Sequence, residues 1–141
     1  MIQETARRVL KIEAESILNL IDRIDDNFVR AVDLIYRCKG KIVLTGIGKS
    51  GLISKKIAST LSSTGTPAFL IHPAEGIHGD LGMLSPKDIV IILSNSGETE
   101  EILQLVPLLK RMGLKMIIIT GNPKSTLASR CDIIINASVK E

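Results

Sequence analysis

Residues 89–103 read IVIILSNSGETEEIL, and this stretch decides the fold. Its first five residues are apolar, as is typical of a strand that is buried on both faces. A polar turn, residues 94–99, follows at once, and a helical pattern of apolar residues begins after it. Such a turn presents backbone N–H groups and hydroxyls to an anion at a helix N-terminus, which predicts a phosphate site. A capped helix with acids in its first turn explains the same pattern without a ligand.

Apolar runs and helical patterns alternate over the whole of residues 41–141. The patterns predict strands at 42–44, 67–71, 89–93, 116–119 and 133–135, and helices at 50–62, 99–112 and 125–130. Because the strands are continuously apolar, they predict an α/β fold, a three-layer α-β-α sandwich in which helices cover both faces of a five-stranded parallel sheet. Pro107 should kink the helix at 99–112 or move one of its ends.

Two helical patterns in residues 1–40 precede this core and are expected to belong to the same domain. Apolar residues at three- and four-residue spacing predict one long amphipathic helix from Ala6 to Ile24. Its apolar surface is larger than a domain edge usually hides, so we expect part of it to pack on another subunit. Asp25 or Asp26 is predicted to cap the second helix.

Composition narrows the classes of function. The 141 residues suit a single domain, and the net charge of +3 is spread along the chain without a basic run. Aromatic residues make up only 2%, which argues against stacking on nucleic-acid bases. No apolar stretch approaches the roughly 20 residues that a membrane span requires, and the N-terminus does not read as a signal peptide. We therefore expect a cytoplasmic protein that binds neither nucleic acid nor membrane, with two reduced cysteines.

A second candidate site is the glycine-rich loop TGIGKSG, residues 45–51. Lys49 supplies a mobile cation, and Ser50 can cap the following helix or contact an anion. The spacing does not match a P-loop, but it fits the dinucleotide fingerprint G-x-G-x-x-G. Residues 58–74 contain no acid that could anchor a ribose, yet a Rossmann-type nucleotide site stays an alternative, as does a simple tight turn.

Two further polar clusters flank the second strand. Residues 72–80, HPAEGIHGD, hold both histidines of the chain, and a histidine at the carboxyl end of a buried strand suits proton transfer. The same cluster could bind a metal, although its ligand spacing is not compact. Residues 62–67, SSTGTP, read as an ordinary turn at the amino end of the strand, which is the wrong end for a ligand of the same subunit.

The chain resembles the sugar isomerase (SIS) domain, and within it the arabinose-5-phosphate isomerases. The segments that carry the resemblance are GIGKSG (46–51), SSTGTP (62–67), HPAEGIHGDLGM (72–83), ILSNSGETEEI (92–102) and ITGNPKSTLA (119–128). The resemblance implies a flavodoxin-like sheet and a homotetramer. It also implies interconversion of D-ribulose 5-phosphate and D-arabinose 5-phosphate through an enediol(ate), which supplies a precursor of lipopolysaccharide. Family members continue with a C-terminal segment that carries a functional histidine, and often with CBS domains, which have no counterpart in these 141 residues.

The resemblance assigns roles to single residues. Substrate and phosphate binding fall on Gly48, Ser50, Gly65, Thr66, Ser94, Asn95, Ser96 and Thr99, with Gly65 and Thr66 acting across a subunit boundary. Catalysis falls on Lys49, His78, Glu101 and Glu141. His72 matches a position that can hold zinc, although the reaction requires no cofactor. A non-catalytic sugar-phosphate sensor on the same fold stays the alternative to an enzyme.

Overall fold

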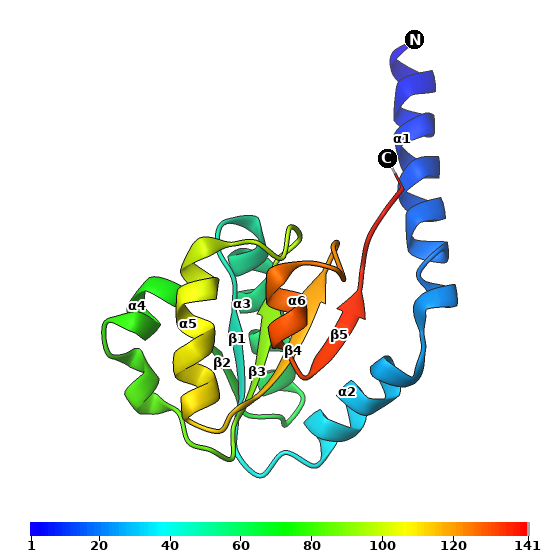
Figure 1. The fold of residues 1–141 in the computed structure, drawn as a ribbon. Helices are drawn as coiled ribbons and strands as arrows, with labels where there is room; N and C mark the ends of the chain where they lie inside the picture. Colours follow the sequence, from blue (N-terminus) through cyan, green and yellow to red (C-terminus); the bar gives the residue numbers. More distant parts are fainter. Residues whose placement is uncertain (141) are drawn as a thin grey trace.

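The computed structural model describes residues 1–140 and has the predicted α/β architecture (Figure 1). Along the chain, the helices and strands are α1 (Ile2–Leu18), η1 (Ile21–Arg23), α2 (Asp26–Tyr36), β1 (Ile42–Thr45), α3 (Lys49–Ser63), β2 (Ala68–Leu70), α4 (Pro73–Ile77), η2 (Asp80–Met83), β3 (Ile89–Leu93), α5 (Glu100–Arg111), β4 (Lys115–Thr120), α6 (Thr126–Arg130) and β5 (Ile133–Asn136). The predicted strands, and the predicted helices of the α/β core, agree with these bounds to within one residue.

The five strands form one parallel sheet in the order β2-β1-β3-β4-β5. The chain enters the sheet at β1, continues to the edge strand β2, and returns to pair β3 with the other side of β1. This reversal makes the gap between the carboxyl ends of β1 and β3 the topological switch point, where ligands of such sheets usually bind.

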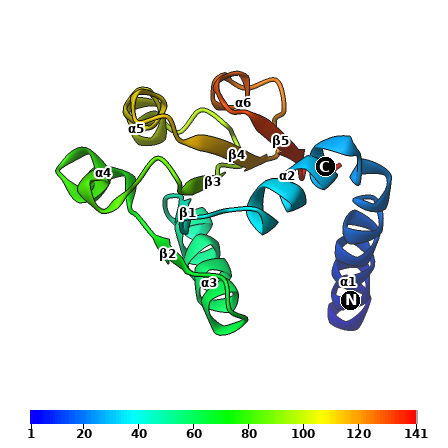
Figure 2. The ribbon, with the colours of Figure 1, turned by 90° about the horizontal axis from the view of Figure 1, so that it is seen from below.

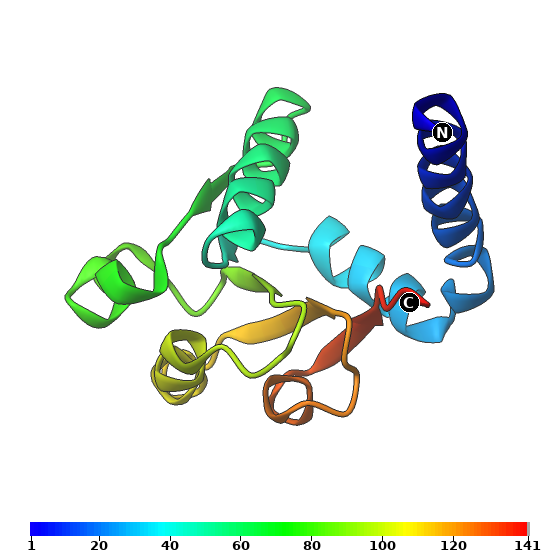
Figure 3. The same cartoon turned by 90° about the horizontal axis from the view of Figure 1, so that it is seen from above.

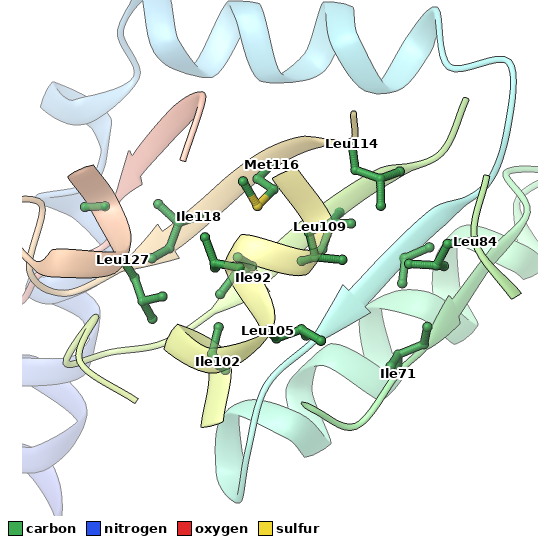
Figure 4. Close-up of a cluster of buried hydrophobic side chains, with 14 residues drawn as sticks. Ile71, Leu84, Ile92, Ile102, Leu105, Leu109, Leu114, Met116, Ile118 and Leu127 are labelled. Carbon is green, nitrogen blue, oxygen red and sulfur yellow. The ribbon is translucent and has the colours of Figure 1, made fainter. Parts of the chain in front are cut away.

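Helices cover both faces of the sheet, as Figures 2 and 3 show: α4, α5 and α6 lie on one face, and α2 and α3 on the other. The side chains of β3 alternate between the two resulting cores. Val90 and Ile92 pack with the buried residues of α5 and α6 (Figure 4), whereas Ile89, Ile91 and Leu93 pack on the opposite side with α2 and α3. Burial on both faces explains why the strand carries no polar residue before Ser94.

The predicted end of the first helix was wrong, and two short helices were not predicted. The first helix ends at Leu18 instead of continuing to Ile24, and a 3-10 turn follows it. Asn19 and the aspartates after it favour local side-chain hydrogen bonds over helix, so the apolar spacing alone overestimated its length. The short helices α4 and η2 were not predicted. Pro73 at the first position of α4 and the capping His72 start α4.

Pro107 lies on the exposed face of α5 and leaves that helix continuous. Proline has no N–H to donate to the carbonyl four residues earlier in the helix. On the solvent-facing side of α5, water can bind this carbonyl instead. Pro107 therefore does not move a helix end, and a kink at this residue stays a prediction.

Helix α1 stands away from the rest of the fold (Figures 1 and 3), and none of its residues is buried. Large apolar side chains are nevertheless exposed along it: Ile2, Val9, Leu10, Ile12, Ile17 and Leu18. Within residues 1–140, no helix is both long enough and apolar enough to cross a membrane.

Candidate functional site

Helices α3 and α5 begin beside the switch point, at the carboxyl ends of β1 and β3, and neither start has a side-chain cap. Within residues 1–140, several first-turn backbone N–H groups make no hydrogen bond: those of Lys49, Ser50, Glu100, Glu101 and Ile102. The contrast with two neighbouring helices is clear, because Asp25 caps α2 and Ser125 caps α6. Free N–H groups and the helix dipole make the starts of α3 and α5 suitable for an anion.

A hollow of about 150 Å³ lies beside the start of α3, at the carboxyl ends of β3 and β4. Its lining combines three predicted binding residues, Ser50, Ser94 and Asn95, with the loop that follows β4. The full lining is Ser50, Leu93, Ser94, Asn95, Ile119, Thr120, Gly121 and Ala137. The structure thus brings the glycine loop and the 94–99 turn together around one small space.

Hydroxyl groups of the 94–99 turn hold its shape and leave donors for a ligand. Ser94 Oγ accepts the Gly97 N–H at 3.1 Å and lies 2.8 Å from Thr99 Oγ1. Only one hydrogen lies between the two hydroxyl oxygens, so the other stays available. Ser96 Oγ accepts the Glu98 N–H at 3.1 Å and keeps its own hydrogen free. The turn can therefore offer two O–H donors beside the N–H groups of α5.

The acidic side chain of this turn is directed to another helix. Glu98 Oε1 accepts the Thr126 N–H at 2.8 Å, and the Gly97 carbonyl accepts the Leu127 N–H at 3.0 Å. Hydrogen bonds from the backbone N–H and the side chain of Thr126, with help from Arg130, lower the pKa of Glu98. The carboxylate is therefore ionised and is neutralised locally by the start of α6.

The glycine loop is compact because two of its glycines touch. A Cβ on Gly46 would lie 2.9 Å from the carbonyl carbon of Ser50, and one on Gly51 would lie 2.8 Å from the Gly46 oxygen. Gly48 forms the N-terminal end of α3 with a positive φ, and Lys49 next to it is exposed. Packing within the loop therefore accounts for the glycine spacing that also fits a dinucleotide fingerprint.

Other predicted site residues lie outside the 150 Å³ hollow. Gly65 and Thr66 lie at the amino end of β2 and line a separate hollow of about 470 Å³ with α2. His78 and Glu101 are exposed at the end of α4 and the start of α5, and their side chains make no hydrogen bond or ion pair within residues 1–140. Glu141 lies outside the described residues.

The geometry offers little for a metal or a reactive thiol. His72 Nδ1 accepts the Ala74 N–H at 3.2 Å, which leaves only Nε2 for a ligand. Within residues 1–140, no three His, Cys, Asp or Glu side chains lie close enough together to hold a metal ion. Zinc at His72 stays a prediction from the family resemblance. Burial, with a smaller effect of Asp132, raises the pKa of Cys131 to about 12, so its thiol stays protonated at neutral pH.

Sequence reasoning assigned no site residue to the loop after β4, although residues 119–128 carry part of the family resemblance. This loop packs against the 94–99 turn. The carbonyl of Asn95 accepts the Gly121 N–H at 3.0 Å and the Thr120 hydroxyl at 3.3 Å. A Cβ on Gly121 would overlap the Asn95 side chain. The sequence did contain a signal for this loop. Thr120 and Gly121 lie at the carboxyl end of the strand that pairs with β3, and the carboxyl ends of neighbouring parallel strands meet at one edge of the sheet.

Comparison with known proteins gives a family context to this site. The model of the SIS domain matches residues 34–141. Arabinose 5-phosphate isomerase KdsD of Pseudomonas aeruginosa is 50% identical over 135 residues, which are 96% of this chain and 41% of that protein. KdsD of Yersinia pestis is 49% identical over 139 residues, or 99% of this chain and 42% of that protein. The chain thus spans about two fifths of the length of these relatives.

A solved structure shows the same fold with a ligand. It is the c3406 protein of E. coli CFT073 in complex with arabinose 5-phosphate, and it aligns with a TM-score of 0.92 at 41% identity. The alignment covers 99% of this chain and 74% of that chain. The five-stranded parallel sheet and its N-terminal helix are therefore shared with a protein whose structure holds a sugar-phosphate ligand.

Gly97→Ala should destabilise the protein more than Gly113→Ala. Both glycines have positive φ, of 66° and 76°, which costs a residue with a side chain about 1–2 kcal/mol. At Gly113 the added Cβ meets nothing within 4 Å, whereas at Gly97 it overlaps the side chain of Ser125. Overpacking should add about 1–3 kcal/mol at Gly97 only. Urea unfolding measures the difference, and equal free energies of unfolding would show that the turn does not rest against Ser125.

Proposed function

The chain belongs to the SIS domain family, and we propose that it binds a pentose phosphate and catalyses an aldose–ketose isomerisation, between D-ribulose 5-phosphate and D-arabinose 5-phosphate. One observation carries this proposal: two uncapped helix starts and a hydroxyl-rich turn converge at the switch point of the sheet. Relatives that are about 50% identical and named arabinose 5-phosphate isomerases support the choice of substrate.

The phosphate group would bind at the start of α5. Backbone N–H groups of Glu100 and Glu101 point their donors to this position, and hydroxyls of Ser94 or Thr99 and of Ser96 add to them. Ser50 would contact the phosphate from the other side of the hollow, and Asn95 would line it. Charge-assisted hydrogen bonds of this kind are about twice as strong as neutral ones, so they would anchor the unreactive end of the substrate.

The reacting carbons would then lie toward the exposed polar side chains around the site. A carboxylate, Glu101 or Glu141, would move the proton between C1 and C2, as a positioned general base does. The exposed Lys49 would stabilise negative charge on the enediolate oxygen. His78 would transfer a hydroxyl proton or assist ring opening. Zinc at His72 would need ligands beyond residues 1–140, and no step of this scheme uses it.

Sugar-phosphate binding without turnover is the second candidate function. Ser50 and Ser94 line the hollow, whereas His78 and Glu101 do not. This geometry supports anion binding directly. It supports proton transfer only through residues that lie outside the lining of the hollow. A sensor domain would need the serines alone, whereas an isomerase needs Lys49 and a carboxylate as well.

We propose that the partner is a second copy of the chain, in a homo-oligomer. The family resemblance implies that this oligomer is a tetramer. Helix α1 buries none of its own residues and exposes Leu10 and Ile17 on one side. Gly65 and Thr66 lie at the amino ends of the strands, whereas Ser94 lies at their carboxyl ends. They could therefore serve a sugar site only in another subunit.

Arabinose 5-phosphate should bind to the chain, and Ser96→Ala should weaken the binding about tenfold or more. A hydrogen bond to a charged group contributes about 1.5–3 kcal/mol, and Ser96 would donate one to the phosphate. Ser129→Ala is the matched control, because Ser129 is an exposed serine whose hydroxyl is bonded within α6. Isothermal titration calorimetry measures both dissociation constants. No binding, or equal binding by the two variants, would contradict this phosphate site.

Solvent deuterium should enter the transferred position of the sugar if the chain is an isomerase. In heavy water, NMR of the pentose phosphate should show deuterium at C1 or C2, and Glu101→Gln should slow this exchange by about 10²–10⁴-fold while phosphate binding persists, if Glu101 is the base. Binding without any exchange would favour the sensor. Exchange that Glu101→Gln leaves unchanged would assign the base to another residue.

Leu10→Asp should break the oligomer, whereas Arg8→Gln should leave it intact. The two positions are two residues apart on α1, which places them on nearly opposite sides of the helix at about 100° per residue. Each change lowers the net charge by one, but only Leu10→Asp removes an apolar side chain from the proposed contact. Light scattering after size-exclusion chromatography gives the mass, and equal masses for wild type and Leu10→Asp would exclude α1 as the contact.

A further inference from the structure

Glu98 is the one acidic residue of the 94–99 turn, and it links this turn to a helix that lies after the next strand. Its Oε1 accepts the N–H of Thr126, the first residue of α6, at 2.8 Å. The adjacent carbonyl of Gly97 accepts the N–H of Leu127, the second residue of α6, at 3.0 Å. Two consecutive residues of the turn therefore bind two consecutive N–H groups at the start of one helix.

These contacts use donors that would otherwise be unsatisfied. The first N–H groups of a helix have no partner inside it, and the third one of α6 is taken by the capping Ser125 hydroxyl at 3.3 Å. Glu98 and Gly97 complete this set, so the start of α6 has no N–H group left for an anion. The lowered pKa of Glu98 agrees with a carboxylate that is ionised in this contact.

The rest of the turn is held on the same side. The carbonyl of Asn95 accepts the Gly121 N–H at 3.0 Å, and Gly97 lies against the side chain of Ser125. The hydroxyls of Ser94, Ser96 and Thr99 take no part in these outer contacts, because their hydrogen bonds stay within the turn. The outer contacts thus fix the backbone, while the hydroxyls remain for a ligand.

We propose that Glu98 is a positioning residue of the anion site, which clamps the 94–99 turn against the start of α6 and so keeps its donors in binding geometry. The proposal rests on the proposed function of this turn as a phosphate site. Glu98 does not touch the ligand, and it acts through the backbone that it holds.

Removal of Glu98 should change anion binding in opposite directions, depending on whether its charge or its contact with Thr126 matters more. Loss of a negative charge close to an anion site should strengthen anion binding or leave it unchanged. Loss of the clamp should weaken anion binding, because the donors must then be ordered when the ligand binds. Glu98→Ala and Glu98→Gln both remove the charge, but only the glutamine retains an oxygen that can accept the Thr126 N–H. The pair therefore separates the two effects.

The test is calorimetric titration of the full chain with inorganic phosphate and with arabinose 5-phosphate, well below the unfolding temperature. Glu98→Ala should weaken the binding of both ligands about tenfold. Glu98→Gln should stay within about threefold of wild type, or bind more tightly. A role in stability alone would lower the melting temperature of Glu98→Ala and leave its dissociation constants unchanged, which would overturn the proposal.

The donor can be removed from the other side of the contact. Thr126→Pro deletes the N–H that Glu98 accepts, at the first position of a helix, where proline is well tolerated. Ser125 before it has φ −70° and ψ 165°, a conformation that a following proline allows. Thr126→Pro should therefore weaken phosphate binding as Glu98→Ala does, whereas Thr126→Ala, which loses only the hydroxyl and keeps the N–H, should weaken it much less. This pair decides the question even if Glu98→Ala does not fold.

Failure of the clamp and failure of the phosphate site give different results. If wild type binds phosphate and arabinose 5-phosphate, but Glu98→Ala and Thr126→Pro bind them equally well, the clamp is wrong and the site stands. If wild type binds neither ligand, the phosphate site is wrong, and the role of Glu98 is wrong with it.

Discussion

Burial of β3 on both faces is the constraint on which the rest of the structure depends. Its five side chains fill two separate cores, and the strand pairs with β1 on one side and β4 on the other. No position along such a strand can carry a polar group without a buried partner. Polar chemistry is therefore confined to the point where the strand ends, at Ser94, and the same argument places Thr45 to Lys49 and Thr120 to Ser125 at the same edge.

At this edge of the sheet, the helix starts differ in whether their first N–H groups have hydrogen-bond partners. This difference distinguishes a structural contact from a candidate binding site. The start of α6 is satisfied by Ser125, Gly97 and Glu98, so its role is to hold the neighbouring turn. The starts of α3 and α5 lack side-chain caps, and Ser50 at the start of α3 lines the hollow together with Ser94, where the turn before α5 begins. Free N–H groups are stabilised by water or by a ligand, so an anion would suit the starts of α3 and α5 and not the start of α6.

Helix α1 raises a different requirement. An isolated helix of this length is only marginally stable in water, and most helices are stabilised when an apolar face packs on something else. No residue of α1 is buried, and Figures 1 and 2 show it projecting from the fold. Its apolar side chains accordingly suit a contact with another copy, and the same assembly would bring Gly65 and Thr66 to a site that their own chain cannot reach.

The sequence by itself determined the strands, the polar turns at their carboxyl ends and the fold class, because burial on both faces leaves a continuous apolar run that is visible locally. It did not determine the end of α1, the short α4, or which polar residues meet. The hydrogen bond of Glu98 to Thr126 spans 28 residues, and Ser50 reaches Ser94 only because β1 and β3 are neighbours. Only the tertiary structure decided these contacts, since strand order and the approach of separate loops depend on packing between distant segments that no local pattern encodes.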